Sequence, residues 1–284
     1  MNILIIDGPG LHPSSAARAL GGGLHRGGHG VIVHPVKLQD LGWFPRYGIE
    51  RRVDRILEVH HPDVIHVFSS EPWFADAFTG HGVSVVHSAY DRSSNADWVI
   101  APSQKARAGM GGRAAGDNLA ACLPYPIEIG EEVPGAGDFV LAVADRKDRT
   151  ARKWVADTAA VHRDIPIRFE GKASDARFVL YLSSRQEVWP AGVVEAMAAG
   201  RAVVTAWVGV ATEFVVEGVT GFLSAPGDVA SLASHVRYLW HEPDEAAKLG
   251  FASREEAKAL FSGDEQVRTL LRWYLRAGVS RLAV

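Results

Sequence analysis

The feature that most restricts the fold of this chain is the alternation of short apolar runs with helix-like segments. In the first half the apolar runs are Asn2–Ile6, Val31–Val33, Val64–Phe68, Val83–His87 and Trp98–Ala101. Short runs bounded by Gly, Pro and Asp are typical of buried strands. Strands that alternate with helices form βαβ units, and near-continuous apolar strands indicate a parallel sheet covered on both faces.

Helical spacing and a change of composition complete the pattern of the first half. The segments predicted to be helical are Ser14–His25, which Gly27 and Gly28 end, and Ile49–Val59. Residues Ile129–Asp138 contain Gly, Pro and acidic residues without periodicity. This segment is interpreted as an interdomain linker.

After the linker the alternation starts again. The predicted strands are Phe139–Ala144, Ile165–Phe169, Phe178–Leu182 and Ala202–Ala206, and the predicted helices are Arg152–His162, Ala191–Ala199, Val229–Trp240, Pro243–Ala259 and Asp264–Ala277. We therefore expect an α/β fold of two tandem doubly wound Rossmann-like domains, at residues 1–130 and 138–262. Ligands of such sheets bind at the carboxyl ends of the strands, so two sets of strand ends could face one cleft.

Charge and cysteine content exclude several classes of protein. Lys and Arg number 30 against 33 Asp and Glu, a formal net charge of −3, which argues against a protein that wraps nucleic acid. The single cysteine, Cys122, excludes an intramolecular disulfide and a cysteine-cluster metal site. The start MNILIIDGPG lacks the basic region of a signal peptide, and no apolar stretch is long enough for a spanning helix. We expect a soluble cytoplasmic protein, with peripheral membrane contact left open.

The most informative segment is Ser183–Gly200, with the sequence SSRQEVWPAGVVEAMAAG. It is expected to run from a strand end through a loop into a helix, with Pro190 in the first helical turn and Gly200 just after the C-cap. Glu187 lies in the loop and Glu195 lies on the helix among apolar residues, where a buried carboxylate must be paired or hydrogen-bonded. A ligand with hydroxyl groups is one suitable partner, and the N–H groups at the helix start favour an anion such as a diphosphate.

This segment resembles the signature of retaining GT-B glycosyltransferases of family four, also called group 1. The signature is Glu, seven residues, Glu-Ala-Met-Ala, one residue and Gly; here Glu187 is followed by VWPAGVV and then by EAMAAG at 195–200. The resemblance continues at family-like spacing through Gly209 and Glu213, EGVTGFL at 217–223 and PGD at 226–228. Weaker similarities in the first half are LHRGGHGVIV at 24–33, HPDVIH at 61–66, VVH at 85–87 and APS at 101–103.

The resemblance implies a site for the donor sugar nucleotide. Glu187 would hydrogen-bond the hydroxyls of the donor sugar, helped by the backbone of the residues that follow it, namely Trp189, Pro190, Ala191 and Gly192. Glu195 would bind the ribose hydroxyls of the nucleotide. His87 would lie beside the transferring sugar. In this family the last helix tends to cross back onto the first domain, which is expected here of residues 263–284.

The resemblance also implies a basic pair that neutralises the leaving diphosphate in place of a metal. Lys153, expected to open a helix, matches the family lysine, and its partner would be Arg146 or Arg149. The segment IRFEGKA, which contains Lys172, would read the base of the nucleotide. Gly10, in the loop after the first strand, would approach the diphosphate or the acceptor.

The chain departs from the family pattern at several places. Ala144 and Asp145 stand where the family has Gly-Arg, Trp189 and Pro190 replace Phe-Gly, and GPGLHPSS replaces the Gly-Gly loop near the N-terminus. The region between the basic loop and Glu187 is shorter than in the family by the equivalent of a βα unit. The chain therefore resembles a trimmed member of the family.

Structural roles remain as alternatives to the functional ones. Glu187 and Glu195 would then be a capping acid and a buried structural acid, His87 a satisfied core histidine, and Lys153 part of a solvated helix start. Other candidates are weaker: His25, His29 and His34 lack a fixed metal-ligand spacing, and GPGLHP has proline where a dinucleotide-binding loop has its third glycine. No metal site is expected, and His12 in the same loop receives no role.

The reaction implied by the resemblance is retaining transfer of a sugar from a nucleoside-diphosphate sugar to an unidentified acceptor. It would proceed by front-side displacement, without a metal or other cofactor and without nucleic acid as a partner. Two alternatives keep the fold: a catalytically silent homologue that binds a sugar nucleotide or a partner protein, and a sugar-nucleotide epimerase. A phosphorylase is disfavoured because it would need a pyridoxal-phosphate lysine in a longer chain.

Overall fold

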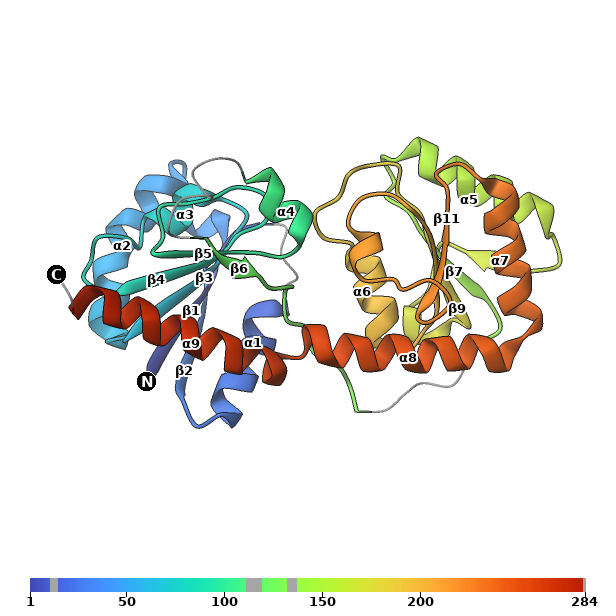
Figure 1. The fold of residues 1–284 in the computed structure, drawn as a ribbon. Coiled ribbons are helices and arrows are strands. Elements are labelled where there is room, and N and C mark those ends of the chain that lie inside the picture. The colour runs from blue at the N-terminus through green and yellow to red at the C-terminus, as the bar shows by residue number, and fades with distance from the viewer. Residues whose placement is uncertain (11–14, 111–118, 132–136, 283–284) are drawn as a thin grey trace. The chain divides into compact units, whose positions relative to one another are not determined.

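The computed structural model describes residues 1–10, 15–110, 119–131 and 137–282. Contacts within the chain divide it into two compact units. Unit 1 contains Met1–Glu128 and Leu260–Val284, and unit 2 contains Ile129–Ala259. Each unit has one parallel sheet flanked by helices (Figure 1).

The sheet of unit 1 has six parallel strands in the order β2-β1-β3-β4-β5-β6. The strands are β1 (Asn2–Asp7), β2 (Gly30–Pro35), β3 (Val64–Phe68), β4 (Ser84–Ser88), β5 (Trp98–Ala101) and β6 (Leu119–Cys122). The helices are α1 (Ala16–Arg26), α2 (Pro45–His60), α3 (Pro72–Asp76), α4 (Gln104–Gly109) and α9 (Gly263–Leu282), with a 3₁₀ turn η1 (Leu38–Leu41). Because β1 lies between β2 and β3, the order of the strands reverses there, which is the switch point of a doubly wound sheet.

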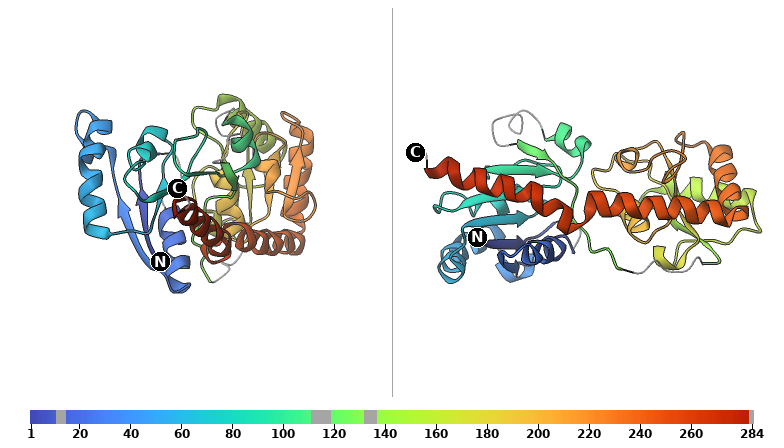
Figure 2. Two further views of the ribbon diagram at one scale, coloured as in Figure 1. Left: turned by 60° about the vertical axis from the view of Figure 1, so that its left-hand side comes forward. Right: turned by 60° about the horizontal axis from the view of Figure 1, so that its bottom comes forward.

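The core of unit 1 includes the last helix of the chain. Helices α1 and α9 lie side by side (Figures 1 and 2). Their backbones meet at two glycines: a Cβ on Gly23 would lie 2.6 Å from the carbonyl carbon of Gly263, and a Cβ on Gly263 would lie 2.2 Å from the carbonyl oxygen of Ala19. The close approach lets Tyr274 of α9 reach His66 in β3, with 2.5 Å between the hydroxyl oxygen and Nδ1.

The sheet of unit 2 has five parallel strands in the order β11-β10-β9-β7-β8. The strands are β7 (Val140–Val143), β8 (Ile167–Arg168), β9 (Phe178–Tyr181), β10 (Val203–Ala206) and β11 (Gly221–Ser224). The helices are α5 (Arg149–Val161), α6 (Ala191–Ala198), α7 (Val229–His241) and α8 (Pro243–Phe261), with 3₁₀ turns η2 (Ala173–Asp175) and η3 (Ala211–Glu213). Apolar side chains of β7, β9 and β10 form one buried cluster with those of α5 and α7, among them Val140, Leu180, Val204, Val155 and Val236.

The prediction of two doubly wound parallel α/β sheets is confirmed. The predicted starts of α6, α7 and α8 are those observed, whereas α2 and α5 begin earlier than predicted, at Pro45 and Arg149. Helix α5 begins at Arg149 because the Asp148 carboxylate accepts a hydrogen bond of 3.0 Å from the Ala151 N–H. The expectation that Lys153 opens this helix is therefore wrong. Pro190 is the N-cap residue of α6 and not part of its first turn.

The short elements α3, α4, β6 and β11 were not predicted from the sequence. Residues 169–177, which connect β8 to β9, contain the 3₁₀ turn η2 and no α-helix. Residues 132–136 of the expected linker, and His12, lie outside the described residues. In the part of the chain that the structure describes, no helix is long and apolar enough to cross a membrane.

Candidate functional site

A pocket of about 640 Å³ opens in unit 2 at the carboxyl ends of β7 and β8. It is lined by residues that end or follow these two strands and by one side of α6: Leu141–Ala144, Arg146, Arg152, Phe169–Ser174, Glu195 and Ala199. Ligands of doubly wound sheets bind at this edge. The pocket is therefore the leading candidate for a ligand site in unit 2.

Five charged side chains line this pocket, and three of them are cationic. Arg146, Arg152 and Lys172 contribute positive charges, and Glu170 and Glu195 contribute negative ones. Among the described residues, none of the three cations has an acidic partner within 4.0 Å. The Arg152 guanidinium lies 4.1 Å from the centre of the Phe169 ring, and this cation–π contact holds the charge at the wall of the pocket. Unpaired cations in a concave site attract an anionic ligand.

Glu195 supplies the pocket with an acceptor. The residue lies on α6 between the buried Val194 and Ala196, and its carboxylate forms no hydrogen bond to any other described residue. Burial of part of the side chain raises the pKa of Glu195 above its ordinary value. The side chain is exposed, so water solvates its carboxylate in the unliganded chain, and a ligand that donates hydroxyl hydrogen bonds would find a free acceptor there. The alternative of a buried structural acid is wrong for Glu195, because its side chain is exposed.

The loop that carries Arg146 is fastened to the loop that precedes α6. The Asp148 carboxylate accepts hydrogen bonds from the Ser184 N–H (2.7 Å) and the Ser184 hydroxyl (2.6 Å), besides capping α5. Arg185 donates a hydrogen bond of 3.0 Å to the carbonyl of Lys147. Burial by itself would raise the pKa of Asp148, but these hydrogen bonds and the charge of Arg185 lower it below its ordinary value.

Glu187 lies in this second loop and is half-buried. Its carboxylate accepts hydrogen bonds from the Tyr181 hydroxyl and from the Ser183 hydroxyl, the latter at 3.1 Å. Gly209 packs closely against the backbone of this loop. Its φ is +64°, and a Cβ at this position would lie 3.1 Å from the backbone nitrogen of Glu187. Glu187 is thus fixed in position and is not among the residues that line the pocket.

The residues after Glu187 form the start of α6. Trp189 and Pro190 are buried, and the Trp189 ring packs edge-on against Phe214 with 5.9 Å between centroids. Gly192 fits tightly against the sheet, since a Cβ there would lie 2.8 Å from a methyl carbon of Val143. Ala191 is exposed at the first helical position. The side chain of Trp189 therefore serves packing, and the backbone of this turn remains the part that suits a ligand.

The expected basic pair is only partly assembled. Arg146 lines the pocket, whereas Lys153 and Arg149 are exposed and do not. Lys153 forms an ion pair of 2.5 Å with Asp157, one turn further along α5. Arg152 occupies the wall in their place. It was missed because the predicted helix began at Arg152 itself, which gave this residue no loop position.

His87 and Gly10 belong to unit 1. The His87 ring is fully buried, with Nδ1 2.8 Å from the Ser94 hydroxyl and Nε2 2.9 Å from the carbonyl oxygen of Ser69. Nε2 must donate to that carbonyl, so Nδ1 accepts from Ser94. Gly10 has a φ of +154°, and a Cβ there would lie 2.4 Å from the Ser70 nitrogen. Both residues are thus tied to the loop that follows β3.

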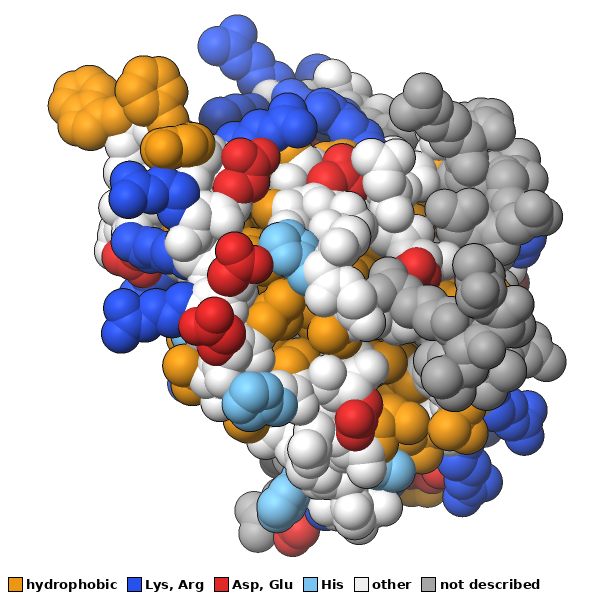
Figure 3. Space-filling view, turned by 90° about the vertical axis from the view of Figure 1, so that its left-hand side faces the viewer, with side chains coloured by type: hydrophobic (Ala, Val, Ile, Leu, Met, Phe, Trp, Pro, Cys, Tyr) orange, Lys and Arg blue, Asp and Glu red, His pale blue; other side chains and the backbone are white. Residues whose placement is uncertain are grey.

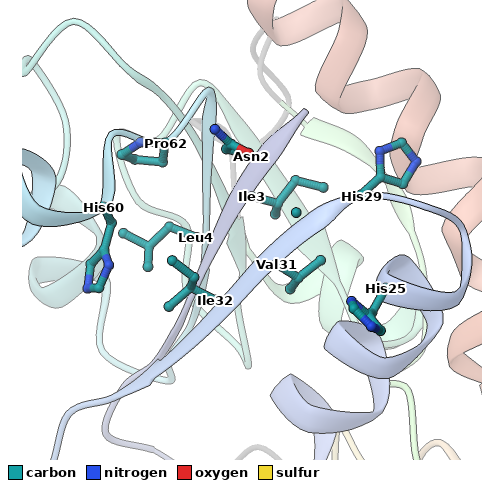
Figure 4. Close-up of a pocket in the computed structure, with 10 residues that line it drawn as sticks. Asn2, Ile3, Leu4, His25, His29, Val31, Ile32, His60 and Pro62 are labelled. Carbon is teal, nitrogen blue, oxygen red and sulfur yellow. The ribbon is translucent and has the colours of Figure 1, made fainter.

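A second hollow, of about 430 Å³, lies at the edge strand β2 of unit 1. Three histidines take part in its lining, with His25 and His29 on one side of the strand and His60 on the other (Figure 4). Their rings do not converge. Among the described residues, no group of three or more His, Cys, Asp or Glu side chains could hold a metal ion.

Comparison with known proteins identifies a recognised domain that contains part of the pocket lining. Residues 171–256 match the family described as "Glycosyl transferases group 1". Over 137 residues the chain is 31% identical to a glycogen synthase of Mycobacterium tuberculosis, an alignment that covers 45% of this chain and 33% of that protein. The chain thus spans about a third of the length of this curated relative.

Solved structures share the whole fold. The crystal structure of Anabaena Alr3699/HepE in complex with UDP superposes with a TM-score of 0.68 at 18% identity, covering 96% of this chain and all of that chain. A glycosyltransferase from Rickettsia africae gives 0.71 at 14% identity, covering 97% of this chain and 98% of that chain. With these neighbours, the two Rossmann-like units have the GT-B fold.

Proposed function

We propose that the chain is a glycosyltransferase that uses a nucleoside-diphosphate sugar, and that the pocket of unit 2 binds the nucleotide. The observation that carries the proposal is the partnerless carboxylate of Glu195 in a pocket with three unpaired cations. The ribose hydroxyls are the donors that Glu195 needs, and the diphosphate is the anion that Arg146, Arg152 and Lys172 need. The match of residues 171–256 to group 1 glycosyl transferases supports the same function.

The proposed chemistry breaks the bond between the anomeric carbon and the diphosphate oxygen. An acceptor hydroxyl attacks from the same face, so the anomeric configuration is retained, and its proton passes to the leaving phosphate oxygen. Negative charge grows on the diphosphate, and preorganised cations at that position lower the barrier without a metal. The backbone N–H groups at the start of α6 would add to this stabilisation.

Glu187 is proposed to orient the donor sugar. Its bonds to Tyr181 and Ser183 hold the carboxylate in one place, so little conformational freedom is lost when a sugar hydroxyl binds. Lys153 would join the diphosphate site only after leaving Asp157, and His87 would face a sugar only after giving up a hydrogen bond. We therefore assign the diphosphate first to Arg146 and Arg152.

UDP is the first nucleotide to test, since a structural neighbour with the same fold was solved in complex with UDP. Titration calorimetry with UDP, GDP, ADP and dTDP, in the presence of EDTA, tests the site. One nucleotide is expected to bind, and Arg152→Ala and Arg146→Ala to weaken it about tenfold or more, as for charge-assisted hydrogen bonds. The exposed Arg163→Ala in the same unit is the matched control. Equal affinity in all three variants would contradict the assignment.

A catalytically silent protein is the second candidate. The short connection between β8 and β9 and the fully engaged ring of His87 favour it. Release of nucleoside diphosphate from the cognate sugar nucleotide by the purified chain, lost in Arg152→Ala, would exclude the silent alternative. Nucleotide binding without any release or transfer across an acceptor library would support it.

A further inference from the structure

The loop between η1 and α2 in unit 1 exposes large aromatic side chains. Trp43 is 98% exposed, Phe44 77% and Tyr47 60%. Tryptophan is strongly buried on average in folded proteins, so an almost fully exposed one is informative. The side of α2 that packs against the unit is formed by Ile49, Val53 and Ile56 instead. The three aromatic residues therefore do not contribute to the hydrophobic core of unit 1.

The backbone holds these rings away from the unit. Gly42 ends η1 with a φ of +78°, and Pro45 begins α2, so Trp43 and Phe44 occupy the turn between a glycine and a proline. Tyr47 follows in the first turn of the helix. Glycine adopts the left-handed φ of Gly42 without strain, and Pro45 restricts the backbone at the helix start, so the sequence favours this path of the backbone.

Three arginines adjoin the aromatic residues. Arg51, Arg52 and Arg55 line a shallow hollow of about 480 Å³ together with Leu41, Trp43, Phe44, Tyr47 and Gly48. The Arg51 guanidinium lies 5.6 Å from the centre of the Tyr47 ring. None of the three arginines has an acidic partner among the described residues. Figure 3 shows hydrophobic side chains projecting at the edge of this side of the molecule, beside Lys and Arg side chains.

The three acidic residues of α2, Glu50, Asp54 and Glu58, are not among the residues that line this hollow. Glu50 pairs with Arg46, at 3.4 Å, and Asp54 pairs with His81, at 3.1 Å. At helical spacing Tyr47, Arg51 and Arg55 follow one another at every fourth residue and form one stripe. The stripe is cationic although the helix as a whole carries both signs of charge.

We propose that this aromatic–arginine face (Trp43, Phe44, Tyr47, Arg51, Arg52 and Arg55) docks the protein on an anionic phospholipid bilayer. Tryptophan and tyrosine rings partition to the level of the lipid headgroups, where one end of the ring is apolar and the other is wet. Arginine guanidinium groups bind the lipid phosphates. The exposed Leu38, beside the same turn, adds apolar contact. The proposal does not depend on what the pocket of unit 2 binds.

Co-sedimentation of the full chain with vesicles tests the proposal. One set of vesicles contains phosphatidylcholine alone, and the other contains phosphatidylcholine with phosphatidylglycerol. Binding is expected only to the second set and is expected to weaken as salt rises. Arg51→Gln, Arg52→Gln and Arg55→Gln are each expected to weaken it about fivefold. Trp43→Ser with Phe44→Ser is expected to abolish it at all salt concentrations.

Matched controls remove the same groups elsewhere. Phe251→Ser removes an aromatic side chain that is 63% exposed on α8. Arg92→Gln with Arg163→Gln and Arg237→Gln removes three exposed positive charges, as many as Arg51→Gln, Arg52→Gln and Arg55→Gln remove when combined. Controls that bind like the wild type, with loss confined to the face, would establish the proposal. Absence of binding to anionic vesicles, or equal loss in the controls, would overturn it. Concentration-dependent self-association lost with the same face variants, without vesicle binding, would assign the face to a second copy and overturn it as well.

Discussion

Replacement of Asp148 tests how the donor pocket is held together. Asp148→Ala removes the N-cap of α5, which costs about 0.5–2 kcal/mol of stability. It also leaves the Ser184 N–H without its acceptor in a half-buried loop, which adds about 1–2 kcal/mol. The free energy of unfolding of unit 2 should therefore fall by about 1.5–4 kcal/mol. The loop that carries Arg146 should also lose its position, so nucleotide affinity should fall.

A matched cap variant separates the two contributions. Asp228 caps α7 in the same way and accepts a hydrogen bond of 3.0 Å from the Ser231 N–H. Unlike Asp148, it is exposed and accepts no hydrogen bond from a second loop among the described residues. Asp228→Ala should therefore lose only the cap energy and should leave nucleotide affinity unchanged. Hydrogen exchange of peptides from unit 2, measured in increasing urea, follows unit 2 without a contribution from unit 1.

The pH dependence gives a second readout of the same residue. The pKa of Asp148 is lowered in the folded chain, so its contribution to stability is present above the unfolded value near 3.8 and is lost as pH falls through the folded value. Asp148→Ala should therefore flatten the stability curve of unit 2 below that pH. The reasoning would be refuted if Asp148→Ala and Asp228→Ala destabilised unit 2 equally and both bound nucleotide like the wild type.

Three further predictions concern single residues. Arg254 is 2% exposed and donates hydrogen bonds to the carbonyls of Ala198 and Gly130. Arg254→Ala should therefore lower the free energy of unfolding, measured in urea, by about 3 kcal/mol or more. A decrease below about 1 kcal/mol would count against this role. Burial, with a smaller contribution from the charge of His87, lowers the pKa of His66 from an ordinary 6.5 to about 3. The stability of unit 1 should therefore fall by about 1.4 kcal/mol per pH unit as the pH is lowered from 6.5 towards 3. His66→Gln should remove this slope. Glu195→Gln should weaken nucleotide binding and leave the melting temperature of the unliganded chain nearly unchanged, because the side chain is exposed and forms no hydrogen bond to another described residue; unchanged affinity would contradict the account.

The order of strands and helices could be predicted because each strand is a short apolar run and each helix has its own spacing. The start of α5 could not be predicted in the same way, since it depends on one hydrogen bond from a side chain. Asp148 shows this: its cap moves the start of α5 to Arg149, and the shift takes Lys153 out of the first turn. With this helix start Arg152 lines the pocket, and no local sequence pattern predicts that position.

Only part of the candidate site could be predicted, because several of its contacts join residues far apart in the sequence. Arg146, Lys172 and Glu195 were expected from the sequence, and the structure places all three in the lining of one pocket. The tether between Asp148 and Ser184 joins residues 36 positions apart, so no local pattern encodes it. The hydrogen bonds of His87 to Ser69 and Ser94 depend likewise on how the loops after β3 and β4 pack. The sequence shows that Trp43 lies between Gly42 and Pro45, but it does not show whether the side chain is buried. Only its exposure in the structure distinguishes it from a core residue.

The most direct test of the central claim measures whether Glu195 binds the ribose of the nucleotide. Titration calorimetry compares UDP with its 2′,3′-dideoxy analogue, or the corresponding pair for whichever nucleoside diphosphate binds, on the wild type and on Glu195→Ala. Hydrogen bonds to a charged group are worth about 1.5–3 kcal/mol, so the wild type should bind the dideoxy analogue about 10- to 100-fold more weakly. Glu195→Ala should bind both nucleotides with the same reduced affinity. If Glu195→Ala still discriminated between them as strongly as the wild type, or if the wild type bound neither, the pocket would not be the donor site.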